Sequence, residues 1–291
     1  MGYGYGYGYG YGYGYGYGYG GGNAGGGGFG AVSGDLDVRP TSLFFALGPG
    51  APPSFPSTLH LSAAWDHRSW DHRTRSALAF GEFAAKVNWQ NLVSTQEEQT
   101  LECFTWRRPN PSLFIQGEIG RLQALMRDER ERYMQEILSQ HDGATGYFLA
   151  LLGITRGAKP WTSTLIELTT RVGELIAVFY KNKYARARPT QICPGLMAPF
   201  GPPGHPAFPS GHATSSKLLA ECLKLVVPAE YHGELEWLAD RIALNRERAG
   251  FHYESDSEFG RLLAGKCLAR WLAATCPEFE LIRDNAKNRE W

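Results

Sequence analysis

The sequence predicts an all-α protein, a bundle of amphipathic helices that follows a low-complexity N-terminal tail. Three observations indicate this class. From about Thr74 onward, apolar residues recur with the spacing of one helix face, and prolines separate the periodic segments. Alternating apolar and polar runs, which are typical of strands, are nearly absent. We therefore expect helices at residues 74–92, 113–140, 145–155, 163–184, 210–226, 229–248 and 256–274.

Residues 1–34 are predicted to form a disordered Gly/Tyr-rich tail. Glycine and tyrosine alternate over residues 2–20, and a glycine-rich run continues to about Gly30. Glycine loses much conformational entropy on folding, and so uniform a tract cannot build a specific core. We interpret the tail as a tether. The alternative is self-association through tyrosine stacking, which would make the chain a noncatalytic assembly module. The folded domain is expected to span residues 35–291.

Residues 35–60 are rich in proline, serine and glycine and are expected to be irregular. The four residues Trp-Asp-His-Arg then occur twice, at 65–68 and at 70–73. Paired histidines and aspartates are found in metal sites, but a spacing of five places the two copies on different helix faces. We therefore expect local ion pairs here instead of a metal site.

The segment 163–184 is the most apolar of the expected helices. It has one apolar stripe, but charged residues interrupt it, and no run of about eighteen uncharged apolar residues occurs in the chain. No basic segment followed by an apolar one begins the sequence, so no secretory signal is expected. These features predict a soluble, cytoplasmic protein. The stripe consists of Leu165, Leu168, Val172, Leu175, Ile176 and Phe179.

The composition is that of an ordinary globular chain, with 43% hydrophobic and 20% charged residues. The formal net charge is zero, which argues against a nucleic-acid binder, since those proteins normally carry a basic surplus. The five cysteines include no Cys-x-x-Cys pair. An odd, scattered set favours buried free thiols over a disulfide framework.

Three motifs that carry candidate chemistry follow one another in the second half of the chain. The first is Lys181 with Arg188-Pro189 after six residues, and the second is 209–212, Pro-Ser-Gly-His. The third is Arg246, His252 after five residues and Asp256 after three more. Each alone has an ordinary structural explanation, such as a solvated helix face or a capped turn. From average residue usage, all three would occur together by chance in about one chain in a million.

This ordered set resembles the signature of the type 2 phosphatidic acid phosphatase (PAP2)/vanadium haloperoxidase superfamily, which includes bacterial class A acid phosphatases. The resemblance covers residues 163–274 and implies an all-α bundle of that type. Asn245 stands where the family usually has serine, a position on which the chemistry does not depend. The resemblance implies an enzyme that acts on a tetrahedral oxyanion.

The expected anion site combines cations with helix-terminal donors. The three cations Lys181, Arg188 and Arg246 would surround a phosphate or vanadate. Ser210 would add a hydroxyl, and Gly211 a backbone N–H that no side chain obstructs. Both lie at an expected helix N-terminus, which favours anions. The neighbouring Lys183 and Arg186 are expected to add positive field without direct contacts.

The resemblance assigns distinct roles to the remaining motif residues. His252 would be the nucleophile that forms a phosphohistidine, or the axial ligand if the anion is vanadate. Asp256 would bond the far ring nitrogen of His252 and fix its tautomer. His212 would be the general acid that protonates the leaving group. The other histidines, His60, His67, His72, His141 and His232, are expected to take no direct part in catalysis.

The motifs do not separate a phosphatase from a haloperoxidase. Tyr184 and Arg186 resemble the acid-phosphatase form of the first motif, whereas His205, five residues before the serine, resembles the bromoperoxidase form of the second and would tune a halide site. We favour a phosphatase. Its substrates are expected to be phosphomonoesters and not membrane lipids, because the lipid phosphatases of the superfamily span membranes and this chain has no run long and apolar enough to do so. That enzyme would need no cofactor, whereas a haloperoxidase would need vanadate and take halide and peroxide. Superfamily members often pair through bundle faces, so a homo-oligomer is an open alternative.

Overall fold

The computed structural model describes residues 70–155 and 157–291, and within these ranges the only regular elements are helices. The all-α prediction is confirmed for this part of the chain. The predictions for the tail, for residues 35–60, for the first Trp-Asp-His-Arg copy and for His60 and His67 fall outside it. The long helices are α2 (His72–Lys86), α4 (Ser112–Asp128), α5 (Arg130–Leu151), α6 (Pro160–Tyr184), α8 (Gly211–Lys224), α9 (His232–Arg248), α10 (Glu254–Ala273) and α11 (Pro277–Glu290).

The helices differ from the prediction in several places, and the one expected over 74–92 already ends at Lys86. The helix expected over 113–140 is divided at Glu129, whose backbone is not helical (φ −130°, ψ −32°). The helix expected over 145–155 belongs to α5, which is interrupted at Gly143. The C-terminal α11 was not predicted, although Phe279, Ile282 and Ala286 form its buried stripe. The short turns are η2 (Trp89–Asn91), α3 (Thr95–Thr100), η3 (Glu102–Arg107), α7 (Pro189–Ile192), η4 (Pro194–Leu196) and η5 (Ala229–Tyr231).

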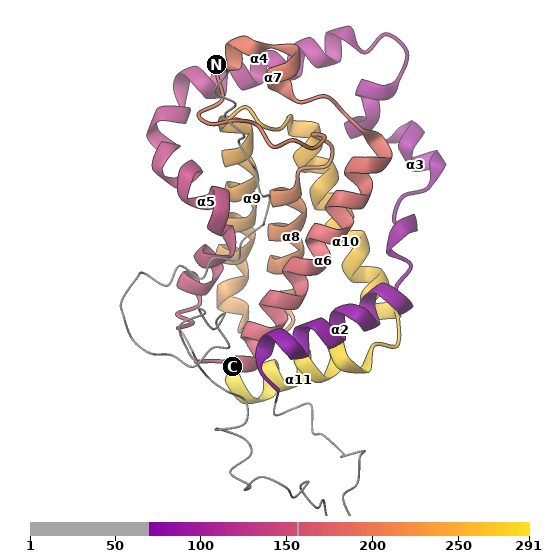
Figure 1. The fold of residues 1–291 in the computed structure, drawn as a ribbon, viewed down its shortest axis with the longest axis vertical. Helices are drawn as coiled ribbons and strands as arrows, with labels where there is room; N and C mark the ends of the chain where they lie inside the picture. Colours follow the sequence, from indigo (N-terminus) through magenta and orange to yellow (C-terminus); the bar gives the residue numbers. More distant parts are fainter. Residues whose placement is uncertain (1–69, 156) are drawn as a thin grey trace, which may run out of the picture. The chain divides into compact units, whose positions relative to one another are not determined.

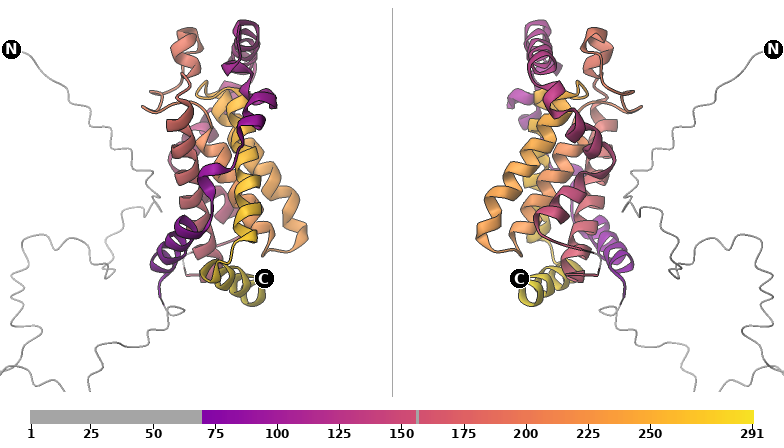
Figure 2. Two further views of the ribbon diagram at one scale, coloured as in Figure 1. Left: turned by 90° about the vertical axis from the view of Figure 1, so that its right-hand side faces the viewer. Right: turned by 90° about the vertical axis from the view of Figure 1, so that its left-hand side faces the viewer.

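Four helices run side by side and form the centre of the bundle. In Figure 1, α6, α8, α9 and α10 follow the vertical direction, α2 and α11 cross their lower ends, and α4 and α7 lie at their upper ends, as the views of Figure 2 also show. At the upper end of the bundle in Figure 1, the last turns of α6 and α9 lie close to the first turns of α8 and α10. This is the end at which all three motifs lie.

The neighbouring helices α6 and α8 approach closely at a glycine. A Cβ on Gly173 would lie 2.7 Å from Ser215 Oγ and 2.8 Å from Ser215 Cα, so only glycine allows this separation. Near the motif end, Phe208 stacks on Phe259 of α10 with ring centroids 4.4 Å apart, and Phe104 and Tyr184 contact both rings. These contacts fix the loop before α8 against α6 and α10.

All five cysteines lie in the described part of the chain and are free thiols, as predicted. Four are buried and Cys193 is partly exposed. Among the described residues, no helix combines the length and the apolar character that crossing a membrane requires.

Candidate active site

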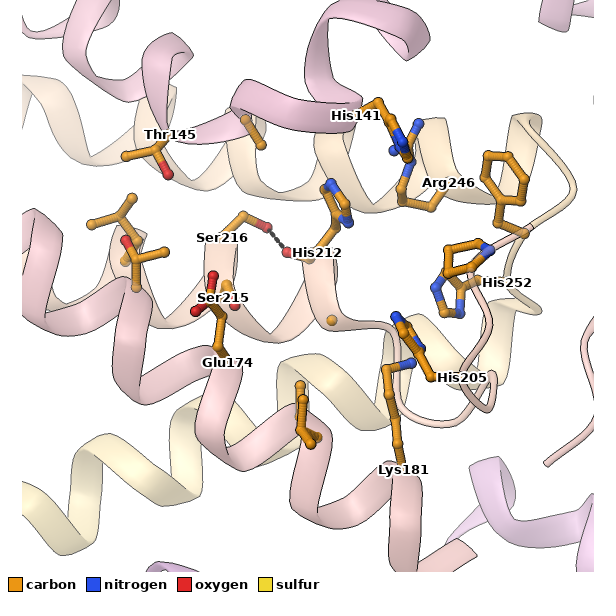
Figure 3. Close-up of a pocket in the computed structure, with 18 of the residues that line it drawn as sticks. His141, Thr145, Glu174, Lys181, His205, His212, Ser215, Ser216, Arg246 and His252 are labelled. Carbon is orange, nitrogen blue, oxygen red and sulfur yellow. Dashed lines mark hydrogen bonds between the residues drawn. The ribbon is translucent and has the colours of Figure 1, made fainter. Parts of the chain in front are cut away.

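The three motifs converge on one cavity between α5, α6 and α8, with a volume of about 120 Å³. One water needs about 10–15 Å³ on this measure, so a tetrahedral anion and part of an ester fit inside. Figure 3 shows Lys181, His205, His212, Arg246 and His252 directed toward the same end of this space. Of the residues predicted for the site, those that line the cavity are Lys181, Arg188, His205, Gly211, His212, Arg246 and His252.

The first motif spans a helix end. Helix α6 stops at Tyr184 because Ala185 adopts a left-handed conformation (φ 50°, ψ 39°), and its N–H donates to Lys181 O at 2.9 Å. The Lys181 ammonium donates to the carbonyls of Pro206, Ala207 and Pro209 at 2.8, 3.1 and 2.6 Å. Burial and the nearby Arg188 lower the pKa of Lys181, whereas the three carbonyl acceptors favour its ammonium form.

Arg188 lies in the extended backbone after α6 and is 3% exposed. Its Nε donates to the His205 carbonyl at 2.9 Å, and its Nη1 donates to the Phe251 carbonyl at 2.9 Å. Nη1 also lies 3.2 Å from His252 Nε2, and Nη2 lies 3.0 Å from His205 Nδ1. One guanidinium therefore joins the loop before α8 to the turn that carries the predicted nucleophile.

In the second motif, Ser210 is the N-cap residue of α8. Its Oγ accepts from Ala213 N at 3.3 Å, and its own N–H donates to the Asp256 carbonyl at 2.9 Å. Ser210 is fully buried and does not line the cavity, whereas Gly211 does. The expected serine hydroxyl is therefore used in capping the helix. Gly211, at the positive end of α8, is the residue of this pair that borders the cavity.

The third motif reverses the chain at the end of α9. Gly250 has φ +78°, its N–H donates to Glu247 O at 2.8 Å, and Phe251 N donates to Arg246 O at 3.0 Å. This is a Schellman turn, which requires a left-handed residue and therefore favours glycine. Arg130 holds the turn from outside by donating to Arg248 O at 2.6 Å. The turn brings His252 back toward Arg246 at the cavity wall.

The geometry of His252 defines its tautomer. Its Nδ1 lies 3.2 Å from Asp256 Oδ2, which also accepts from Tyr253 N at 3.0 Å. Arginine has no acceptor, so the ring nitrogen beside Arg188 must be the one with the lone pair. Nδ1 therefore carries the proton toward Asp256. Burial and then Arg188 and Lys181 lower the pKa of His252 well below its usual value, so the ring is neutral and Nε2 carries its lone pair.

His212, at the first turn of α8, faces a carbonyl of α5. Its Nε2 lies 3.1 Å from Gln140 O, and since a carbonyl only accepts, this nitrogen carries a proton. Burial, followed by the charge of Arg246, lowers the pKa of His212 to about 3. A dianion in the cavity would oppose this lowering, because a nearby negative charge favours the protonated imidazole.

The remaining residues at this end add cationic and aromatic walls. Arg246 is 2% exposed, and its Nη2 donates to Ile137 O at 2.9 Å. His141 lines the cavity beside it and packs on Phe200. Burial and the charges of Lys181 and Arg188 lower the pKa of His205 to about 4, so its ring is neutral at pH 7.

Arg186 does not line the cavity, but it contacts two buried carboxylates behind it. Its Nη1 donates to Asp256 Oδ1 and to Ser255 Oγ, both at 2.7 Å, and its Nη2 donates to Glu118 Oε2 of α4 at 2.5 Å. Glu118 Oε1 accepts from Ser255 N at 3.1 Å. Arg186, Glu118 and Asp256 are all buried. Tertiary packing thus builds a chain of ion pairs and hydrogen bonds from α4 through Arg186 and Asp256 to His252.

Other residues named from the sequence lie elsewhere. Lys183 pairs with Glu98 at the surface at 2.7 Å. His72 lies in α2, and His232 Nε2 lies 3.3 Å from Val227 O, both apart from the cavity. In the second Trp-Asp-His-Arg copy, Asp71 caps α2 by accepting from Arg73 N and Thr74 N, a helix cap where an ion pair was expected.

Sequence reasoning missed three groups of the site, Glu118, His141 and Glu174. His141 was expected to take no part, and it lines the cavity because α5 packs against α8 and α9. Glu174 lines the cavity from α6. Its only signal in the sequence was a position seven residues before Lys181, which places both on one helix face.

No family model and no curated protein matches the chain. Among solved structures, it is similar to the crystal structure of the first transmembrane PAP2 type phosphatidylglycerolphosphate phosphatase from Bacillus subtilis. The two share 16% identity over 74% of this chain and 98% of that chain, with a TM-score of 0.32. The expectation of a soluble, cytoplasmic protein is corrected on this finding, because the matching structure is that of a transmembrane enzyme.

Proposed function

We propose that this chain is a PAP2-type phosphatase that hydrolyses phosphomonoesters through a phosphohistidine at His252. The observation that supports it most strongly is the state of the His252 ring. Its lone pair is on Nε2 at the cavity wall, and its other nitrogen faces Asp256. Arg188 and Arg246 line the same end of the cavity, where they would stabilise the charge of a phosphoryl transition state.

The reaction proceeds in two displacements. With the substrate dianion bound, His212 is protonated. His252 Nε2 attacks phosphorus, the bond from phosphorus to the ester oxygen breaks, and His212 gives its added proton to the departing oxygen and becomes neutral. His212 then takes a proton from water, the resulting hydroxide attacks phosphorus, and the phosphorus–nitrogen bond breaks. Inorganic phosphate leaves, His252 returns to its neutral form, and His212 keeps the proton that it took from water, which is the protonated state in which it entered the cycle. Throughout, Asp256 holds the Nδ1 proton and stabilises the positive ring.

The preference for small phosphomonoesters is supported by the size of the cavity. Its volume of about 120 Å³ accommodates a phosphoryl group and a short organic group. The cations that line it, Lys181, Arg188 and Arg246, match the double negative charge of a phosphomonoester. A phosphodiester has one charge fewer and a second organic group to place.

A second candidate function, vanadate-dependent halide oxidation, is supported by the position of His205. Its Nδ1 lies 3.0 Å from Arg188 Nη2 and its ring lines the cavity, whereas a phosphatase assigns this residue no role. Vanadate would be held by His252 Nε2 together with Arg188 and Arg246, and it would activate hydrogen peroxide toward a halide. Both functions use the same residues, so activity assays must separate them.

The test compares hydrolysis of p-nitrophenyl phosphate without vanadate with bromination of a phenolic dye in vanadate, bromide and hydrogen peroxide. We expect hydrolysis, an acid-labile phosphorylated histidine after an alkaline quench, and the loss of both in His252→Gln. The matched control is His232→Gln, a histidine outside the cavity, which should retain wild-type turnover. Hydrolysis that persists in His252→Gln would refute the mechanism, and vanadate-dependent bromination without hydrolysis would select the second candidate.

A further inference from the structure

The cavity extends beyond the motif residues to a second polar end. Thr145 of α5, Thr170 and Glu174 of α6, and Ser215 and Ser216 of α8 line it. Figure 3 shows Glu174, Ser215, Ser216 and Thr145 on the side away from His205 and His252. The proposed hydrolysis uses none of these residues. We call this set of five the distal end. The apolar side chains that complete the wall include Ala144, Phe148, Ala177, Val178 and Leu219.

Helix geometry places the distal end at a defined separation from the anion site. Glu174 precedes Lys181 by seven residues, so both lie on one face of α6, about 10 Å apart along its axis. On α8, Ser215 follows Gly211 by four residues, or about 6 Å, and Ser215 touches Gly173 beside Glu174. The backbone positions of the distal end therefore lie about 6–10 Å along the helix axes from those of the cationic end.

The distal end offers mainly hydrogen-bond acceptors. Thr170 Oγ1 donates its proton to Ile166 O at 2.6 Å, and Ser216 Oγ donates to His212 O at 2.5 Å, so both oxygens have lone pairs available for a ligand. Glu174 adds a carboxylate. The cavity thus has cations at one end and acceptors at the other, which complements a molecule with an anionic and a cationic group.

We propose that Glu174 and its neighbours at the distal end bind a protonated amine in the leaving group of the substrate. The substrate is then a phosphomonoester of an amino alcohol, with its ammonium about 6–10 Å from phosphorus. This inference rests on the proposed function, since the phosphoryl group must occupy the end with His252. An ammonium donates three hydrogen bonds and accepts none, and its bonds to a carboxylate are stronger than those of a neutral hydroxyl.

The test compares three series of esters with two, four and six methylenes: ω-aminoalkyl, ω-hydroxyalkyl and plain alkyl phosphates. For the wild-type protein, we expect kcat/KM to be about 10–100-fold higher for the aminoalkyl ester of matching length than for its alkyl counterpart. In Glu174→Gln, which keeps the size of the side chain and removes its charge, the ratio should fall to about one. Glu167→Gln is the matched control, because Glu167 lies on the same helix, pairs with Arg171 and does not line the cavity.

Equal kcat/KM for the aminoalkyl and alkyl esters in the wild type would overturn the inference. So would a preference for the hydroxyalkyl esters that Glu174→Gln abolishes, which would assign the distal end to a polyol. A non-hydrolysable ω-aminoalkyl phosphonate, titrated by calorimetry, separates this inference from the proposed function. Tighter binding of this phosphonate than of its alkyl analogue, lost in Glu174→Gln, would support the subsite even without ester hydrolysis. Equal binding would refute the subsite even where hydrolysis occurs.

Discussion

Replacing Arg186 by glutamine removes the cation that two buried carboxylates share. Arg186 donates to Asp256 Oδ1 at 2.7 Å and to Glu118 Oε2 at 2.5 Å, with Ser255 Oγ as a third acceptor. All three charged groups are buried, so the carboxylates cannot recover solvation by water. Removing one partner of a buried ion pair typically costs about 3–5 kcal/mol. We expect the free energy of unfolding of Arg186→Gln to fall by this amount.

The same substitution should impair turnover through Asp256. Burial raises the pKa of Asp256, and Arg186 opposes that rise. Without the guanidinium the carboxyl is protonated at a higher pH, and its protonated form does not accept the Nδ1 proton of His252. Activity is lost as the pH falls through this pKa, so the acid limb of the kcat profile should move to higher pH. At neutral pH, we expect kcat to fall about 100-fold.

Urea unfolding and pH-dependent hydrolysis of p-nitrophenyl phosphate measure the two effects. Lys183→Gln is the matched control, since Lys183 belongs to the same motif but pairs with Glu98 at the surface. An exposed pair contributes about 1 kcal/mol or less, so this variant should remain close to wild type in both assays. A lower kcat in Arg186→Gln with an unmoved acid limb would refute the connection through Asp256 and indicate a general loosening of the site.

Two further predictions concern stability. Burial raises the pKa of Glu247 to about 7, so the folded state retains a proton that the unfolded state releases, and stability falls as the pH rises from 4.5 to about 7. In urea unfolding, the free energy of unfolding of Glu247→Gln should therefore equal that of the wild type near pH 4 and exceed it by about 3 kcal/mol at pH 8. The same difference between the two proteins at both pH values would contradict the raised pKa. Gly173→Ala should lower the free energy of unfolding by about 1–3 kcal/mol, because its Cβ would meet the Ser215 backbone. Gly265→Ala is the control and should not be destabilised, because a Cβ there would meet open space. A lower melting temperature for Gly265→Ala than for Gly173→Ala would refute this reasoning.

The sequence predicted the helical fold and most of the cationic end of the cavity because those signals are local. The spacing from Arg246 to His252 requires a helix end and a glycine turn, both of which nearby residues determine. The apolar stripe of 163–184 likewise predicted α6 to its last residue. Where local signals were weak, as in the sparsely apolar α11, the helix was missed.

The groups that the sequence did not assign depend on contacts between distant helices. Glu118 is 68 residues from Arg186 and 137 from Ser255, and no spacing rule connects such positions. His141 reaches the cavity only because α5 lies against α8 and α9. Ser210 shows the converse case. Its position at a helix N-terminus was predicted, but the direction of its hydroxyl depends on the cap that it forms with Ala213.

The internal hydrogen bonds of the cationic end affect how fast product can leave. The ammonium of Lys181 contacts three carbonyls, and Arg188 contacts the His205 and Phe251 carbonyls and two imidazoles. An arriving anion therefore exchanges contacts with these groups, and a departing phosphate returns them to their protein acceptors. Lys181 and Arg188 would therefore both have acceptors when phosphate departs, which would lower the barrier to release and limit inhibition by product.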